Sequence, residues 1–296
     1  MTRSPFLFGE NTQRQLVIAH RGARSLAPEN TLAAAQAARS LGADLWEFDI
    51  EATRDGELVL LHDGTLARTT DAALRFPDRS PWRAADLTYE EIQTLDAGSW
   101  FLKTDPFGTL ASGAVPATQT KEFPGQRVPT LREALAWTRD AGLGADIELK
   151  GNGASAGTGR ASQTVEEAVA LVRELGLECR AFVSSFDRGM IAHLKAIAPE
   201  VAGILLFHSL PENPPAVLEE IGADGAALSL PAFDEQATRC LAADGYGVYV
   251  WTVNGPEDLA RLARNPLVSG VITDWPQRLL EILGRAQTGS VPARAR

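Results

Sequence analysis

The sequence predicts an α/β protein in which eight strand–helix units close into a (β/α)8 barrel. Short apolar runs alternate with segments of helical length along most of the 296 residues. Such alternation implies parallel strands joined by right-handed crossovers. Eight units of this kind close as a barrel. An open doubly wound sheet is the alternative, but no G-x-G-x-x-G motif follows the first strand.

The first unit opens this alternation. Its strand is the apolar run Leu16 to Ala19, and after a P-E-N-T turn the alanine-rich segment Thr31 to Leu41 has the composition of a helix. Asn30 or Thr31 is a suitable N-cap, because a short polar side chain accepts a hydrogen bond from the first helical turn. Gly42 ends the helix.

The second strand, Leu45 to Ala52, alternates large apolar residues with carboxylates. A period of two residues places the apolar side chains on one face and the carboxylates on the other. The carboxylates are Glu47, Asp49 and Glu51. Inward-facing carboxylates near a strand end need a cation or a proton. An R-D-G turn then leads to a second extended run, Glu57 to Leu61, which delivers His62 and Asp63.

The regular alternation is lost between about residues 64 and 127. This stretch contains several prolines, glycines and aromatic residues, with one helix expected around Thr88 to Thr94. We interpret it as a small insertion, placed between the second strand unit and its helix, that folds over one end of the barrel. Its aromatic residues favour an ordered structure.

From Pro129 the alternation resumes, with the helix of the second unit at Leu131 to Ala141. Six more strands are expected at Ala145 to Leu149, Ala181 to Ser184, Ala202 to Phe207, Gly225 to Leu230, Gly247 to Val253 and Gly270 to Thr273. Their helices are expected at Gln163 to Leu175, Arg188 to Ile197, Ala216 to Ile221, Asp234 to Ala243, Pro256 to Arg264 and Pro276 to Leu283. We expect a single domain over residues 1–286 and a frayed tail over residues 287–296.

Composition limits the class of protein. A net charge of −10 argues against nucleic acid as the partner, because nucleic-acid binders usually present a basic face. No run approaches the ~20 apolar residues of a membrane span. No signal peptide is visible either, so we expect a cytoplasmic protein with no integral membrane segment. Cys179 and Cys240 match no ligand spacing and are expected to be buried free thiols. The sequence indicates no oligomeric state.

Two histidines and an arginine are candidates for acid/base chemistry. His20 and Arg21 directly follow the first strand, and His62 ends the extended run after the second. In a (β/α)8 barrel the C-terminal ends of the strands line the active site. Histidines on either side of a bond suit general acid and general base roles near neutral pH. Arg21 adds a fixed fork of donors that matches phosphate oxygens.

Three carboxylates are candidates for a metal site. Glu47 and Asp49 share one face of their strand, and Glu148 stands on the following strand with the parity of Asp146 and Lys150. Three converging carboxylates repel one another unless a divalent cation joins them. Oxygen ligands alone favour a hard ion, Mg²⁺ or Ca²⁺. Lys150 is a candidate for neutralising an anionic substrate oxygen.

Other polar and aromatic residues are weaker candidates. Glu29 is expected either to shape its loop or to reach the metal or substrate, and Asn30 to cap the helix. Trp251, at a strand end, is a candidate for walling a substrate pocket. His193 lies in a helix and is expected on the surface or in the core, and His208 is on the active face without a partner.

At these residues the sequence resembles the glycerophosphodiester phosphodiesterase family. The first motifs are H-R-G-A at His20 to Ala23, P-E-N-T at Pro28 to Thr31, E-F-D at Glu47 to Asp49 and H-D at His62 and Asp63. The later ones are P-T-L-R-E-A-L from Pro129, E-L-K at Glu148 to Lys150, S-S-F-D from Ser184, W-T-V-N from Trp251 and T-D-W-P from Thr273. Together they span nearly the whole chain in the expected order.

The resemblance implies a TIM barrel that hydrolyses a small-molecule glycerophosphodiester to sn-glycerol 3-phosphate and an alcohol. It implies one divalent cation on Glu47, Asp49 and Glu148. Acid/base histidines at His20 and His62 are also implied, as are phosphate contacts from Arg21 and Lys150. The chain departs from the family in extra residues around Gly108 to Gln126 and in the small-residue loop Gly151 to Gly159. Both border the expected pocket mouth.

Two alternatives remain at this point. One is a lysophospholipase D, whose acylated substrate would pack against the aromatic residues of the insertion. The other is a non-catalytic phosphate-ester binder, which is disfavoured because both histidines and all three carboxylates are present. The attacking group is either water or the neighbouring glycerol hydroxyl, and the hydroxyl would give a cyclic phosphate.

Overall fold

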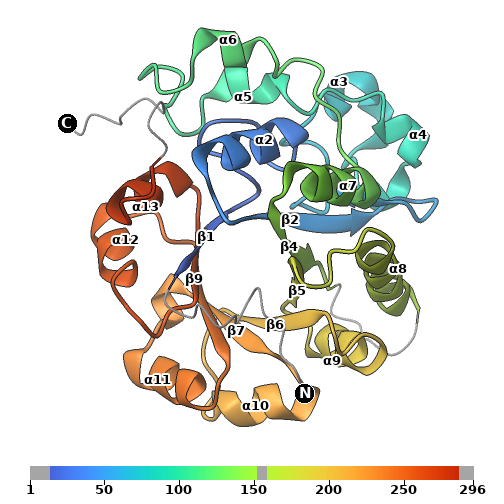
Figure 1. Ribbon diagram of the computed structural model, residues 1–296. Helices are drawn as coiled ribbons and strands as arrows, with labels where there is room; N and C mark the ends of the chain where they lie inside the picture. Colours follow the sequence, from blue (N-terminus) through green and yellow to red (C-terminus); the bar gives the residue numbers. More distant parts are fainter. Residues whose placement is uncertain (1–13, 152–158, 287–296) are drawn as a thin grey trace.

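The computed structural model describes residues 14–151 and 159–286, and shows a closed barrel of parallel strands surrounded by helices (Figure 1). Strand β1 (Leu16–Ala19) pairs with β2 on one side and with β9 on the other, so the sheet closes on itself. The remaining parallel strands are β2 (Leu45–Ala52), β4 (Gly144–Leu149), β5 (Ala181–Ser185), β6 (Ala202–Phe207), β7 (Gly225–Ser229), β8 (Gly247–Trp251) and β9 (Gly270–Thr273). The predicted (β/α)8 barrel is confirmed.

Helices cover the outside of the barrel in the predicted order. They are α2 (Leu32–Leu41), α7 (Leu131–Ala141), α8 (Arg160–Glu174), α9 (Arg188–Ile197), α10 (Pro214–Ile221), α11 (Glu235–Ala243), α12 (Pro256–Leu262) and α13 (Pro276–Ile282). Helix α10 begins two residues earlier than expected, because Asn213 caps it and proline is compatible with the first helical positions. Thr31, and not Asn30, caps α2 by accepting a hydrogen bond from the Ala34 amide.

Strand β2 has the two-faced character that its alternation predicts. Trp46, Phe48 and Ile50 join the large core between the sheet and the helices. The Trp46 indole donates a hydrogen bond to Thr138 of α7 at 2.8 Å. On the opposite face, Leu45 belongs to a second cluster with Phe182 and Tyr249, whose rings lie 5.2 Å apart. Because Glu47 and Asp49 share the parity of Leu45, they lie on the inner face of the barrel, above this cluster.

Strand β3 (Leu58–Leu60) pairs antiparallel with β2 and leads into the insertion, residues 64–127. The helix expected around Thr88 to Thr94 is present, but further short helices that were not expected lie in the same stretch. The insertion contains α3 (Ala72–Arg75), α4 (Tyr89–Ile92), α5 (Ser99–Thr104) and α6 (Ala117–Thr120), beside α2 and α7 (Figure 1). Helices this short are stabilised by tertiary packing more than by their own periodicity, so pattern analysis misses them.

The insertion has two parts that pack differently, a first part over residues 64–97 and a second part over residues 98–127. Most of the first part surrounds a core of its own, here called the insertion core. Its members are Val59, Leu61, Leu66, Ala72, Ala84, Leu87, Ile92, Leu95, Ala97 and Val128. In the second part, Phe101 and Phe123 join the main core, with ring centroids 5.5 Å apart. Thr109 donates a hydrogen bond to the Ser25 carbonyl at 2.6 Å, which ties this part to the loop between β1 and α2.

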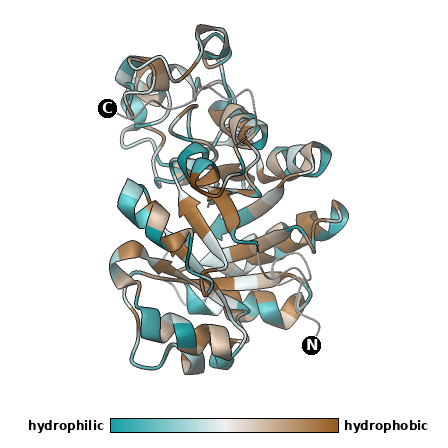
Figure 2. Ribbon diagram, turned by 60° about the vertical axis from the view of Figure 1, so that its left-hand side comes forward, coloured by the Kyte–Doolittle hydropathy of each residue, from teal (hydrophilic) through white to brown (hydrophobic). Residues whose placement is uncertain are grey.

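Surface properties follow this architecture. The strands at the centre are hydrophobic, and hydrophilic residues lie on the outer helices (Figure 2). Cys179 and Cys240 are exposed, so the expectation of buried thiols is wrong. Cys240 lies on the outer face of α11, next to the buried Leu241, and Cys179 lies between α8 and β5.

Within residues 14–151 and 159–286 no helix is long and apolar enough to cross a membrane. The predictions for the N-terminal segment, for residues 152–158 and for the tail lie outside the described residues.

We expect Gly22→Ala to destabilise the protein more than Gly56→Ala. Both glycines have positive φ, +78° and +97°, so each substitution costs about 1–2 kcal/mol of strain. A Cβ on Gly22 would also lie 2.6 Å from the Cβ of Ala34, whereas no described atom lies within 4 Å at Gly56. Overpacking adds about 1–3 kcal/mol at Gly22. Equal losses in urea unfolding of the two variants would contradict this account of the β1–α2 loop.

Candidate active site

The predicted polar residues gather at the C-terminal ends of neighbouring barrel strands. His20 and Arg21 follow β1, Glu47 and Asp49 lie on β2, and Glu148 lies on β4. Register pairs Asp49 with Glu148 and Glu47 with Asp146 across β2 and β4. Asp49 and Glu148 are about a hundred residues apart in the sequence, and the direct pairing of β2 with β4 brings them side by side.

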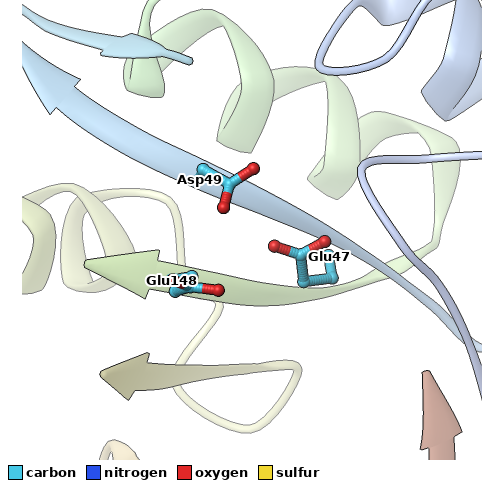
Figure 3. Close-up of side chains that lie close together, drawn as sticks. All are labelled: Glu47, Asp49 and Glu148. Carbon is cyan, nitrogen blue, oxygen red and sulfur yellow. The ribbon is translucent and has the colours of Figure 1, made fainter. Parts of the chain in front are cut away.

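Glu47, Asp49 and Glu148 form a cluster able to hold a metal ion. Each offers one oxygen, and these atoms all lie within 4.8 Å of one another. Figure 3 shows Glu47 and Asp49 on β2 and Glu148 on β4 pointing into one space. Glu47 and Asp49 are fully buried, and Glu47 Oε1 has no hydrogen-bond partner among the described residues. Such an oxygen is costly unless a cation or donor meets it, so the cluster fits a hard divalent ion.

The pKa values of the three carboxyls are pushed apart. Burial raises the pKa of Glu47 well above its usual range, and the charges of Asp49 and Glu148 add to this. Burial and Asp49 raise the pKa of Glu148 to about 7. Burial also opposes ionisation of Asp49, but the charges of Lys150 and Arg21 outweigh it and lower the pKa to about 2. A cation that replaces the protons on Glu47 and Glu148 is therefore favoured in this cluster.

Lys150 and Arg21 bring positive charge to these carboxylates. The Lys150 ammonium lies 2.6 Å from Asp49 Oδ1 and also contacts Glu148 Oε1. The backbone N–H of Arg21 donates to Glu47 Oε2 at 2.7 Å, and its Nε lies 3.5 Å from Asp49 Oδ2. Arg21 adopts φ +53°, a conformation that holds its amide against Glu47. Both predicted phosphate contacts therefore lie against the carboxylate cluster.

Each candidate histidine is held by a carboxylate at Nδ1. His20 Nδ1 lies 2.6 Å from Asp274 Oδ1, and Asn254 donates to the other Asp274 oxygen at 2.7 Å. His62 Nδ1 lies 2.8 Å from Asp63 Oδ1. A carboxylate at Nδ1 favours the tautomer whose Nε2 accepts a proton.

His20 Nε2 lies 4.0 Å from Glu47 Oε2, so this nitrogen points to the cluster. Burial lowers the pKa of both histidines.

Glu29 lies among arginines and makes no contribution to the carboxylate cluster. Arg21, Arg24 and Arg68 donate to its two oxygens at 2.7–2.9 Å. Burial opposes its ionisation, but these arginines hold its pKa far below the usual range. Asn30 donates to Asp49 Oδ2 at 2.9 Å, and so orients a cluster carboxylate instead of capping α2.

An aromatic group stands on the opposite side of the barrel mouth. Trp251, at the end of β8, donates to the Ala227 carbonyl at 3.0 Å. Its ring lies 5.5 Å from Phe186 and 5.2 Å from His208. His208 stacks on Phe186 with centroids 4.3 Å apart, so the expectation that His208 lacks a partner is wrong. His193 lies elsewhere, on α9, in a contact of 3.1 Å with Glu166.

Sequence reasoning assigned no role to Asp274, Asn254, Asp63 or Arg68. Asp274 and Asn254 come after β9 and β8, at strand ends where a barrel places its site. That position, together with polar character, is the signal that would have identified them. The small-residue loop expected to border the pocket mouth falls mainly on residues 152–158, outside the described residues.

The chain matches one protein family and resembles characterised members of it. Residues 20–278 match the model of the Glycerophosphoryl diester phosphodiesterase family. The chain is 31% identical to a glycerophosphodiester phosphodiesterase of Caldanaerobacter subterraneus, over 91% of this chain and 98% of that protein. It is 29% identical to a glycerophosphodiester phosphodiesterase of Bacillus subtilis, over 89% and 84%.

Solved structures agree with the sequence relatives. An Oleispira antarctica phosphodiesterase, solved in complex with the product sn-glycerol-3-phosphate, superposes with a TM-score of 0.74 at 27% identity and covers 91% of this chain and 96% of its own. A glycerophosphodiester phosphodiesterase from Agrobacterium tumefaciens gives 0.69 at 28% identity, over 90% of this chain and 100% of its own.

We expect the metal-free protein to lose stability as the pH rises from about 5 to about 8. The folded pKa of Glu148 is about 7, above its ordinary 4.5, so its protonated form contributes stability that is lost as pH rises through 7. This amounts to about 2–3 kcal/mol, and the raised pKa of Glu47 acts in the same direction. Urea unfolding in EDTA at both pH values measures it.

Two variants control this pH dependence. Glu148→Gln cannot titrate at this position and should make the decline smaller, whereas Glu174→Gln, on the exposed face of α8, should leave it unchanged. A decline that is the same in Glu148→Gln and the unmodified chain would show that the carboxyl group of Glu148 is not responsible.

Proposed function

The chain belongs to the glycerophosphoryl diester phosphodiesterase family, and we propose that it hydrolyses glycerophosphodiesters to sn-glycerol 3-phosphate and an alcohol. The observation that carries this proposal is the meeting of Glu47, Asp49 and Glu148 with two carboxylate-held histidines at one end of the barrel. The product complex of the Oleispira antarctica relative supports the substrate class. A small-molecule phosphodiester is therefore the proposed partner.

One divalent cation, Mg²⁺ or Ca²⁺, is proposed on Glu47, Asp49 and Glu148. When bound it would draw negative charge from the phosphate oxygens. The unpartnered Glu47 Oε1 and the raised pKa values of Glu47 and Glu148 support this site. Arg21 and Lys150 are also proposed to neutralise phosphate charge by binding phosphate oxygens, because both side chains lie against the carboxylate cluster.

His20 and His62 are proposed as the acid/base pair. One accepts the proton of the attacking oxygen, and the other donates a proton to the leaving alkoxide. Asp274 and Asp63 hold their rings and would stabilise the imidazolium form in turn. The attacking oxygen is that of water, or that of the neighbouring glycerol hydroxyl, which expels the alcohol and gives a cyclic phosphate that water then opens to sn-glycerol 3-phosphate. Trp251 is proposed to contact the substrate from the aromatic side of the mouth.

Lysophospholipase D activity is the second candidate function. It is favoured by Phe107 of the insertion, which packs against Arg24 in the β1–α2 loop with its ring centroid 5.3 Å from the guanidinium carbon. The acyl chain of such a substrate, which stays on the glycerol phosphate product, would then lie along this side. A non-catalytic phosphate-ester binder is disfavoured by the intact histidines and carboxylates.

Product analysis tests the reaction directly. With Mg²⁺ or Ca²⁺ the purified chain should release sn-glycerol 3-phosphate from glycerophosphocholine, and EDTA should stop the release until metal is restored, because three unneutralised carboxylates cannot stabilise an anionic phosphate. Faster turnover of a lysophospholipid would favour the second candidate. Turnover of neither diester would refute both.

Replacing either candidate histidine should abolish turnover without unfolding the chain. We expect His20→Ala and His62→Ala to lower kcat by at least about 100-fold, the loss typical of a missing acid or base. His193→Ala is the matched control, since His193 lies on α9 and contacts Glu166 of α8, and it should retain activity. Circular dichroism melting checks that each variant is folded. Retained turnover in either of the first two variants would remove that histidine from the mechanism.

A further inference from the structure

Arg68, in the first part of the insertion, binds two carboxylates beside the candidate active site, those of Glu29 and Asp63. Its guanidinium donates from Nη1 and Nη2 to the two oxygens of Glu29, at 2.9 and 2.7 Å. Its Nε donates to Asp63 Oδ2 at 2.6 Å. The planar fork therefore fixes the orientation of two carboxylates at once.

Each of these carboxylates in turn holds a residue of the proposed mechanism. Asp63 uses its other oxygen for His62 Nδ1, at 2.8 Å. Glu29 Oε1 also accepts a hydrogen bond from Arg21 Nη1, at 2.9 Å. Burial opposes ionisation of Asp63, but hydrogen bonds from Arg68 and His62 lower its pKa, so the carboxylate stays charged. One guanidinium is thus a single carboxylate away from both His62 and Arg21.

The fold of the insertion delivers Arg68 to this position. Leu66, two residues earlier, is fully buried in the insertion core, and its N–H donates to the Trp82 carbonyl at 2.9 Å. Thr70, two residues later, donates its hydroxyl to the Leu66 carbonyl at 2.6 Å. Arg68 therefore projects from a turn that is anchored on both sides.

We propose that Arg68 is a positioning residue, through which the insertion orients the His62 ring and the Arg21 guanidinium for phosphodiester cleavage. This inference rests on the proposed function. It gives the insertion a part in the reaction beyond any effect on which substrates enter.

Arg68→Ala in the full chain with bound metal tests the proposal. We expect kcat to fall about 10- to 100-fold, as for other residues that orient a reacting group from behind. Arg75→Ala is the matched control, because Arg75 lies in the same insertion and makes an exposed pair with Asp71 at 3.0 Å. Exposed pairs contribute little, so its kcat should stay within about twofold of the unmodified chain.

Chemical rescue separates positioning from a merely structural role. The Arg68 side chain is 41% exposed, so a free guanidinium ion can reach the space left by Arg68→Ala. Guanidinium chloride at non-denaturing concentration should restore part of the lost kcat, whereas the same concentration of sodium chloride should not. Arg68→Lys should recover less than guanidinium does, because one ammonium lacks the planar fork.

An NMR measurement provides a readout that does not need turnover. The hydrogen-bonded Nδ1–H of His62, identified by its absence in His62→Ala, should be visible in the unmodified chain and in Arg75→Ala, and lost in Arg68→Ala. Unchanged kcat in Arg68→Ala, or a loss without guanidinium rescue, overturns the proposal, as does an unchanged His62 signal. If the unmodified chain cleaves no diester, the proposed function fails, while the His62 signal still decides whether Arg68 orients that ring.

Discussion

The buried negative charge at the mouth of the barrel is the constraint on which the rest of the site depends. Strand pairing brings Asp49 beside Glu148 and Glu47 beside Asp146, all on the inner face of β2 and β4. Close like charges with little water between them repel strongly. Lys150 and Arg21 offset part of this repulsion for Asp49, but Glu47 and Glu148 keep raised pKa values. The mouth of the barrel is therefore built for additional positive charge.

Charges alternate in sign outward from this cluster. The cations that meet the cluster carboxylates are themselves met by a second set of carboxylates, as Arg21 is by Glu29. The histidines are held in the same way, by Asp274 and Asp63. Each charged side chain of this network fixes the orientation of the next. The orientation of the cluster carboxylates therefore depends on groups that are several hydrogen bonds away.

Local patterns in the sequence predicted much of this arrangement. The alternation in β2 indicated which face Glu47 and Asp49 occupy, and the parity of Glu148 indicated that it would meet them. The contact between Asp274 and His20 was not predicted, because the two residues are 254 positions apart and meet only when β9 pairs with β1. The position of Arg68 was not predicted for a related reason. Its turn is fixed by the insertion core, and helices as short as α3 and α4 leave no periodic signal.

The division of the insertion into two parts bears on how enzymes of this kind can diverge. The first part carries Arg68 on a turn anchored in the insertion core, so changes of length there would displace the link to Glu29 and Asp63. The second part is anchored separately, through Phe101, Phe123 and Thr109. Lengthening or shortening of its exposed turns leaves the first anchor in place. The length of the second part can therefore change without moving Arg68 away from Glu29 and Asp63.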